Sequence, residues 1–145
     1  MKKKIILIVV IGSLGWYLGS PLFIDTVVEE EFVQVKTTEL VVLASGTFSD
    51  ADASHKGSGT ATVYAQEDGS YLLRLTDFSV TNGPSLSVFL TKQGGDMISI
   101  GKLKGNIGNQ NYPIPDAIDV NDYDGVLIYC VPFKVPFARA ILSPS

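Results

Sequence analysis

The chain has 145 residues, with 15 acidic and 11 basic side chains, a formal net charge of −4 and one cysteine. This length allows one domain of ordinary size, and a single cysteine excludes a disulfide bond within the monomer. The acidic balance and the lack of a basic patch that could neutralise phosphates exclude nucleic acid as a partner.

The N-terminus has the pattern of a membrane signal. Three lysines, Lys2 to Lys4, precede an uncharged run from Ile5 to Ile24. At about 1.5 Å per residue, such a run is long enough to cross a hydrocarbon core of about 30 Å. Positive residues stay on the cytoplasmic side, so the pattern predicts a single-pass cell-membrane protein with a cytoplasmic N-terminus and an extracytoplasmic domain.

Residues 1–24 are therefore predicted to be a membrane anchor, with a cleaved signal peptide as the alternative. A signal peptide ends at a small-x-small cleavage site. The small residues Gly19 and Ser20 are followed at once by Pro21, which is a poor first residue of a mature chain. This order favours an uncleaved signal anchor with one transmembrane helix.

Residues 25–39 form an acidic stretch without glycine. It contains one basic residue, Lys36, beside Asp25, Glu29, Glu30, Glu31 and Glu39. A charged stretch of this kind next to a membrane is typical of a solvated spacer. We interpret residues 25–39 as an acidic linker that lifts the domain from the lipid surface.

The pattern of short apolar runs and turns in residues 40–145 is typical of an all-β domain. Short apolar and β-branched runs alternate with turn sequences such as Asp68-Gly69-Ser70 and Asn82-Gly83-Pro84, a spacing typical of a sandwich or barrel. The runs Thr60–Ala65 and Tyr71–Leu75 flank a glycine-bearing loop and are predicted to form a β-hairpin. We expect an antiparallel β-sandwich.

One predicted strand, Val126 to Val131, is apolar on both faces. A strand of this kind belongs in the middle of the fold or under a covering loop. Pro132 and Pro136 follow, and a proline has no N–H to donate to a strand ladder. Cys130 is therefore predicted to be mostly buried and close to the end of a strand.

Several short motifs of this domain occur in an order that matches a known family. They are Gly46-Thr47-Phe48, His55 with Gly59, Thr81-Asn82-Gly83-Pro84, Leu86-Ser87-Val88-Phe89-Leu90, Gly101-Lys102-Leu103-Lys104-Gly105, Gly108-Asn109-Gln110-Asn111-Tyr112, Val126 to Phe133 and Phe137 to Leu142. From about Gly46 to Leu142 the chain resembles the DM13 family, which is proposed to consist of redox or electron-transfer modules. The resemblance implies a β-sandwich and places Cys130 where the family carries its characteristic cysteine.

Cys130 is the candidate redox or cofactor-binding residue. A lone thiol in an exported protein packs as a small hydrophobic group, pairs with another chain, ligates a metal or haem, or does redox chemistry. The first of these needs no function, whereas the second predicts a homodimer through Cys130. Reactivity would need a nearby cation or helix N-terminus, and Lys134 and Arg139 are close in sequence.

His55 is the candidate second ligand, because it is the only histidine. One histidine and one cysteine are two ligands short of a closed tetrahedral site, so Met97, carboxylates or a second protomer would have to complete it. The metal therefore stays unknown, and haem or a metal is possible as a cofactor without being required. As a solvent-facing loop residue, His55 needs no function.

The chain contains no nucleophile elbow, phosphate loop or CxxC pair, so we expect an accessory domain rather than a stand-alone enzyme. The predicted function is a membrane-tethered, extracytoplasmic electron-transfer domain centred on Cys130, which would meet a redox partner protein. The alternative is a non-catalytic cell-surface module that binds a ligand or protein, in which Cys130 is core and the loops near Asn82 and Gln110 contact the partner.

Overall fold

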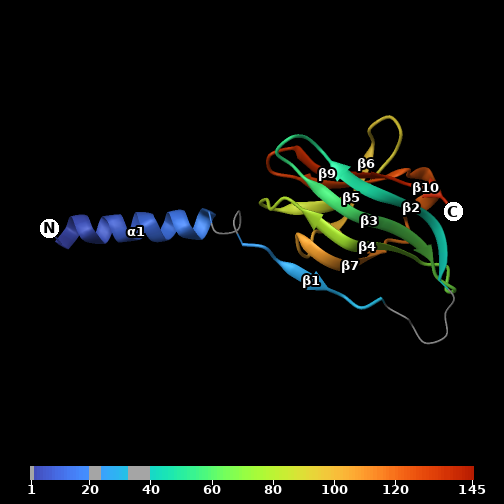
Figure 1. Cartoon of the computed structure of the whole chain (residues 1–145), viewed down its shortest axis with the longest axis horizontal. Coiled ribbons are helices and arrows are strands. Elements are labelled where there is room, and N and C mark those ends of the chain that lie inside the picture. The colour runs from blue at the N-terminus through green and yellow to red at the C-terminus, as the bar shows by residue number, and fades with distance from the viewer. Residues whose placement is uncertain (1, 20–23, 33–39) are drawn as a thin grey trace.

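The computed structural model describes residues 2–19, 24–32 and 40–145 (Figure 1). Their elements are α1 (Lys2–Gly19), β1 (Val27–Glu29), β2 (Val41–Asp50), β3 (Gly57–Ala65), β4 (Tyr71–Val80), β5 (Leu86–Thr91), β6 (Met97–Lys102), β7 (Ile107–Ile114), the 3-10 helix η2 (Val120–Asp122), β8 (Gly125–Cys130), β9 (Val135–Ile141) and β10 (Ser143–Pro144).

The strands form a single curled sheet in the order β1-β7-β4-β3-β2-β9-β8-β5-β6, with β10 paired to β2 (Figure 1). All pairs are antiparallel except β1 with β7, which is parallel. The prediction of an all-β domain is confirmed, including the hairpin of β3 and β4. The strand pairing joins one continuous sheet, so the sandwich, which needs two separate sheets, is not confirmed.

The sheet is continuous because β2 changes partners along its length. Its first part, up to Thr47, pairs with β3, and its last part, from Phe48 to Asp50, pairs with β9. Where the partner changes, Gly46 lies so close to β9 that a Cβ atom would collide with the carbonyl oxygen of Ile141. Glycine is required at such a close approach of two backbones, and β2 thereby links the two halves of the sheet.

The concave side of the curled sheet encloses one hydrophobic core. Phe48 of β2 meets Phe78 of β4 edge to face, with ring centroids 5.1 Å apart, a preferred arrangement for an aromatic pair. The remaining fully buried side chains come from both halves of the sheet, among them Leu73, Leu75, Val88, Val126 and Ile128. Burial from both halves is what keeps the sheet curled.

The N-terminal run does form a helix, α1, but a shorter one than the predicted span. The helix has 18 residues and begins with Lys2, Lys3 and Lys4. Among the described residues, no helix combines the length and the apolar character that crossing a bilayer requires. The prediction of a transmembrane helix is therefore not supported, and residues 20–23 of the predicted span lie outside the described residues.

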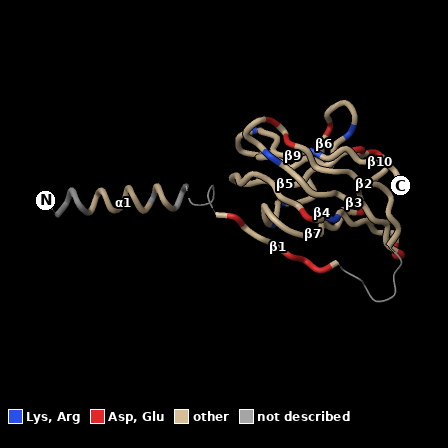
Figure 2. Tube along the Cα trace, in the orientation of Figure 1, with Lys and Arg blue, Asp and Glu red and all other residues tan. Residues whose placement is uncertain are grey.

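Part of the predicted spacer packs against the domain instead of being solvated. Val27, Val28 and Glu29 pair with Ile107, Gly108 and Asn109 of β7, and the Glu30 amide donates to the Asn109 carbonyl oxygen at 2.9 Å. Figure 2 shows the acidic residues of this segment along the edge of the sheet. The linker prediction was wrong for this segment, while residues 33–39 lie outside the described residues.

Two glycines allow β1 to lie this close to the domain. A Cβ atom on Gly105 would collide with the carbonyl oxygen of Thr26, and one on Gly108 with that of Val28. Gly108 also has φ of 107°, a conformation that side chains disfavour. The position of β1 therefore depends on these two glycines, one in the loop before β7 and one in β7 itself.

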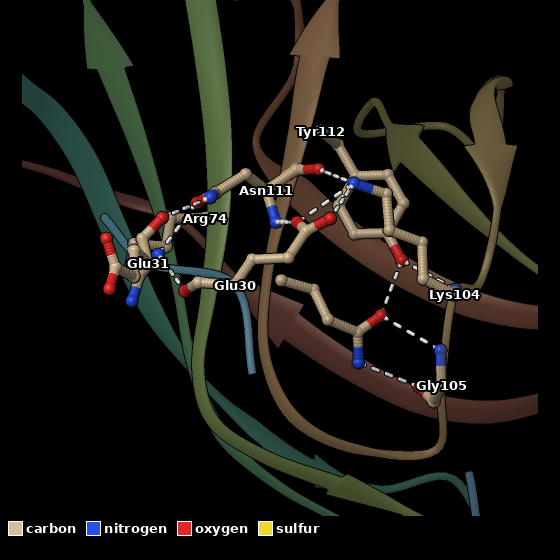
Figure 3. A network of polar contacts seen from close by, with 8 residues as sticks. Glu30, Glu31, Arg74, Lys104, Gly105, Asn111 and Tyr112 are labelled. Atoms are coloured by element: carbon tan, nitrogen blue, oxygen red, sulfur yellow. Dashed lines mark hydrogen bonds and ion pairs between the residues drawn. The ribbon is translucent and has the colours of Figure 1, made fainter. Parts of the chain in front are cut away.

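A network of polar contacts fixes the carboxyl end of β1 (Figure 3). Lys104 Nζ donates to both carboxylate oxygens of Glu30, at 2.7 and 2.9 Å, and to the Asn111 carbonyl oxygen at 2.7 Å. The Asn111 amide donates to Glu30 Oε2 at 2.7 Å. Buried Arg74 donates to Asn111 Oδ1 at 2.8 Å, and Asn111 Nδ2 donates to the Glu31 carbonyl oxygen at 2.9 Å.

Beside this network, hydrogen bonds of Gln110 and Tyr112 stabilise the loop that contains Gly105. Gln110 is fully buried; its Nε2 donates to the Gly105 carbonyl oxygen at 2.8 Å, and its Oε1 accepts from the Tyr112 hydroxyl at 2.7 Å. Burial raises the pKa of Tyr112 to about 12. Gln110 itself thus has a structural role within β7.

We expect Gly108→Ala to release β1 from β7, because the added methyl group occupies the place of the Val28 carbonyl oxygen. Hydrogen exchange of the Glu30 amide, which bonds to Asn109, should become markedly faster. Gly69→Ala is the matched control, since Gly69 also has a positive φ, 83°, but has open space around it. Equal protection of the Glu30 amide in both variants would contradict this account.

The second prediction concerns the Glu30 carboxylate. Burial alone would raise the pKa of Glu30, but the hydrogen bonds from Lys104 and the Asn111 amide outweigh it and hold the pKa below its ordinary value of 4.5. A lowered pKa in the folded state stabilises the protein above about pH 4.5, and this stabilisation is lost as the pH falls through the folded-state pKa.

Glu30→Gln should therefore reduce the free energy of unfolding at pH 7 by no more than about 1 kcal/mol, since the ion pair is partly exposed and screened. Below the folded-state pKa of Glu30, the difference in the free energy of unfolding between the variant and the parent protein should become smaller. Urea unfolding at the two pH values measures both effects. Glu31→Gln is the control, because only the backbone carbonyl of Glu31 takes part in the network, and an equal loss in the control would contradict the prediction.

Candidate functional site around Cys130

Cys130 is the last residue of β8, and its side chain is only 1% exposed. It lies opposite Leu86 of β5 and Val135 of β9, on the same inward face as Ile128 and Val126. The predictions of a buried cysteine and of its place at a strand end are confirmed. The thiol is part of the core, just beneath the turn that joins β8 to β9.

The thiol has one polar contact. Cys130 Sγ donates to the carbonyl oxygen of Pro84 at 3.0 Å. Pro84 belongs to the turn before β5, where Ser85 has φ of 53°, an uncommon conformation for a residue with a side chain. In this contact the sulfur is the hydrogen donor and the Pro84 carbonyl oxygen is the acceptor.

The His55 side chain is hydrogen-bonded to Asp52 within its own loop. Its Nδ1 lies 2.7 Å from Asp52 Oδ2, and Asp52 Oδ1 accepts from the Ser54 and His55 amides at 2.7 and 2.9 Å. The hydrogen bond from the His55 side chain, together with those from the two amides, lowers the pKa of Asp52 to about 2. The aspartate thus shapes the β2–β3 loop and sets the orientation of the imidazole.

The aromatic ring of Phe137 contacts both the His55 ring and the turn that contains Gly83 and Pro84. The His55 ring packs on it, with centroids 4.2 Å apart, and a Cβ atom on Gly83 would lie 2.5 Å from its edge. The His55 loop also contacts the segment before Pro84 directly, because the Thr81 amide donates to the Lys56 carbonyl oxygen at 2.9 Å. Among the described residues, the hydrogen bonds join His55 to Asp52 and Cys130 to Pro84, and none joins His55 to Cys130.

Met97 and Arg139 lie away from Cys130, whereas Lys134 directly precedes Val135, the β9 residue that pairs with Cys130. Met97 pairs with Thr91 at the end of β5 opposite to Leu86, the partner of Cys130. Arg139 faces outward, opposite Leu127. The described residues contain no group of three or more histidine, cysteine, aspartate or glutamate side chains placed to hold a metal ion.

Two hollows that the sequence did not indicate flank the cysteine strand. A pocket of about 380 Å³ adjoins the Pro84 turn, and its lining includes Ile24, Asn82, Ser85 and Leu86. A groove of about 570 Å³ lies on the outer face of β5, β8 and β9. Leu127 and Tyr129, which point to the outer face of the cysteine strand, line this groove. We call the second hollow the outer groove.

We expect His55→Ala to raise the pKa of Asp52 from about 2 toward its ordinary value of 3.8, though not fully, since the two amide donors remain. The depressed pKa stabilises the loop above about pH 3.8, and this stabilisation is lost as the pH falls toward 2. Carboxyl carbon NMR titration measures the change. Asp50 is the internal control, because its lowered pKa depends first on Lys56; an unchanged Asp52 titration would contradict the assignment.

Comparison with known proteins gives one match. Neither the curated proteins nor the solved structures yield a match to this chain. The family model described as "Electron transfer DM13" matches residues 47–142, which include the motifs of the β-domain, His55 and Cys130. Since the match covers well over half of the chain, the protein belongs to the DM13 family.

Proposed function

We propose that this protein is a membrane-associated, extracytoplasmic electron-transfer module in which Cys130 is the redox residue. The observation that carries the proposal is the match of the electron-transfer family model to residues 47–142, which contain the only cysteine of the chain. The strand-end position of Cys130 supports it, because the thiol lies next to two turns, residues 131–134 and the Pro84 turn.

The burial of Cys130 limits the chemistry available to the closed structure. Thiol–disulfide exchange needs a thiolate and direct access to a partner sulfur, and the thiol here is buried and donates to Pro84. We propose that Cys130 reacts in an opened state, in which the Pro84 turn moves. There the Cys130 sulfur would attack the disulfide of a partner and form a mixed disulfide, while the partner's other sulfur leaves as a thiol that takes up the Cys130 proton.

Membrane association is supported by the surface of α1. Its described apolar side chains, from Ile6 to Ile11 and at Trp16, are 56–73% exposed. Apolar surface costs about 25 cal/mol per Å² when it is left in water, and a helix that is apolar around its whole circumference needs an apolar cover. With Lys2, Lys3 and Lys4 at its start, we propose that α1 associates with the cytoplasmic membrane and that the domain lies outside.

The redox proposal is tested on the full chain by thiol titration, with Cys130→Ser as the control. We expect the folded protein to react with a thiol reagent at least about tenfold more slowly than the unfolded chain, because opening must come first. Incubation with glutathione disulfide should give a mixed disulfide that reductant reverses, and this species should be absent in Cys130→Ser. A visible chromophore or bound metal that the serine variant loses would also support a redox site.

A colourless protein whose thiol reacts only after global unfolding would contradict the proposal. That result would favour the second candidate function, a non-catalytic module that binds a ligand or protein, for which the burial of Cys130 is the supporting observation. In that case the outer groove, lined by Leu127, Tyr129, Ile141 and Arg139, is the candidate binding surface.

A further inference from the structure

The chain reaches the domain at the same end as the cysteine. The carbonyl oxygen of Ile24 accepts from Asn82 Nδ2 at 2.5 Å, and both residues line the pocket beside the Pro84 turn. We call the region formed by residues 81–85 and 131–134, together with Ile24, the Pro84 end of the domain. Figure 1 shows the start of the β1 segment and the turn before β9 at this end.

The turn between β8 and β9 exposes apolar side chains at this end. It follows Cys130 directly, and Val131 and Phe133 are 49% and 69% exposed. Lys134, the next residue, completes the turn with φ of 56°. A large aromatic side chain exposed at the tip of a hairpin, followed by a lysine, has the amphipathic character of a segment that enters a lipid interface.

The orientation of this end relative to the incoming chain is fixed by hydrogen bonds. The Thr26 amide donates to Asn106 Oδ1 at 2.6 Å, and Asn106 Nδ2 donates to Asp25 Oδ1 at 2.7 Å. From there β1 continues into the network of Glu30, Lys104 and Asn111. A membrane attachment before Ile24 would therefore bring the Pro84 end, and not the opposite end, closest to the lipid.

We propose that the Pro84 end of the domain rests on the lipid surface, with Phe133 and Val131 inserted at the boundary between headgroups and acyl chains. This inference rests on the proposed membrane association of α1. Lys134 lies at the level of the lipid phosphates. At this end the positive charges of Lys102 and Lys134 are matched by the negative charges of Asp25 and Asp52, so no excess of positive charge selects anionic headgroups, and the surface that fits is zwitterionic phosphatidylcholine.

The test uses the full chain with Trp16→Phe, so that one introduced tryptophan is the only reporter. F133W places it at the turn. The matched control is I141W, because Ile141 is 80% exposed and lies at the other end of β9. Both variants are reconstituted in phosphatidylcholine vesicles with and without brominated acyl chains, and flotation confirms that the protein is bound. We expect brominated lipid to quench F133W emission at least about twofold more than I141W emission.

The outcomes separate this inference from the proposal on which it rests. If the chain does not float with vesicles, both membrane association and the lipid-facing end are wrong. If it floats but neither variant is quenched, or both are quenched equally, the association stands and the proposed orientation is overturned. F133W emission that shifts to the blue with protein concentration in the absence of vesicles would assign the turn to a contact between two copies of the chain, which also overturns it.

Discussion

The structure depends on the change of partner along β2. Because its first part pairs with β3 and Phe48–Asp50 pair with β9, the two halves of the sheet curl around a shared core. Gly46 makes this possible, since any side chain there would meet the Ile141 carbonyl. The curl in turn places Cys130 in the core, beside the two turns that precede the neighbouring strands β5 and β9.

The sequence predicted the strands better than their assembly. Alternation and turn residues locate the hairpin of β3 and β4, and two-sided apolarity locates β8. Neither pattern says whether strands form two sheets or one, because a strand that changes partners has the same periodicity as one that does not. The strand apolar on both faces was expected in the middle of the fold or under a loop; β8 lies inside the sheet between β9 and β5, and its outer residues Leu127 and Tyr129 line the outer groove.

For the candidate site, too, the sequence predicted local features but not the contacts between distant segments. The burial and strand-end position of Cys130 follow from local pattern alone. Its partner, the Pro84 carbonyl, does not, because a contact across 46 residues depends on the register of β5 against β8. The acidic segment was interpreted differently for a related reason. Glu29 and Glu30 look solvated in isolation, but Gly105 and Gly108 make room for the segment and Lys104 pairs with the Glu30 carboxylate.

These features bear on how an electron-transfer partner could meet Cys130. The thiol is closed off by Pro84, and β1 holds the same turn next to the incoming chain through Asn82 and Ile24. If that end lies on lipid, a partner in bulk solvent could not approach the thiol from that side. The reaction partner would then be met at the membrane surface itself, and movement of the Pro84 turn would couple lipid contact to exposure of the cysteine.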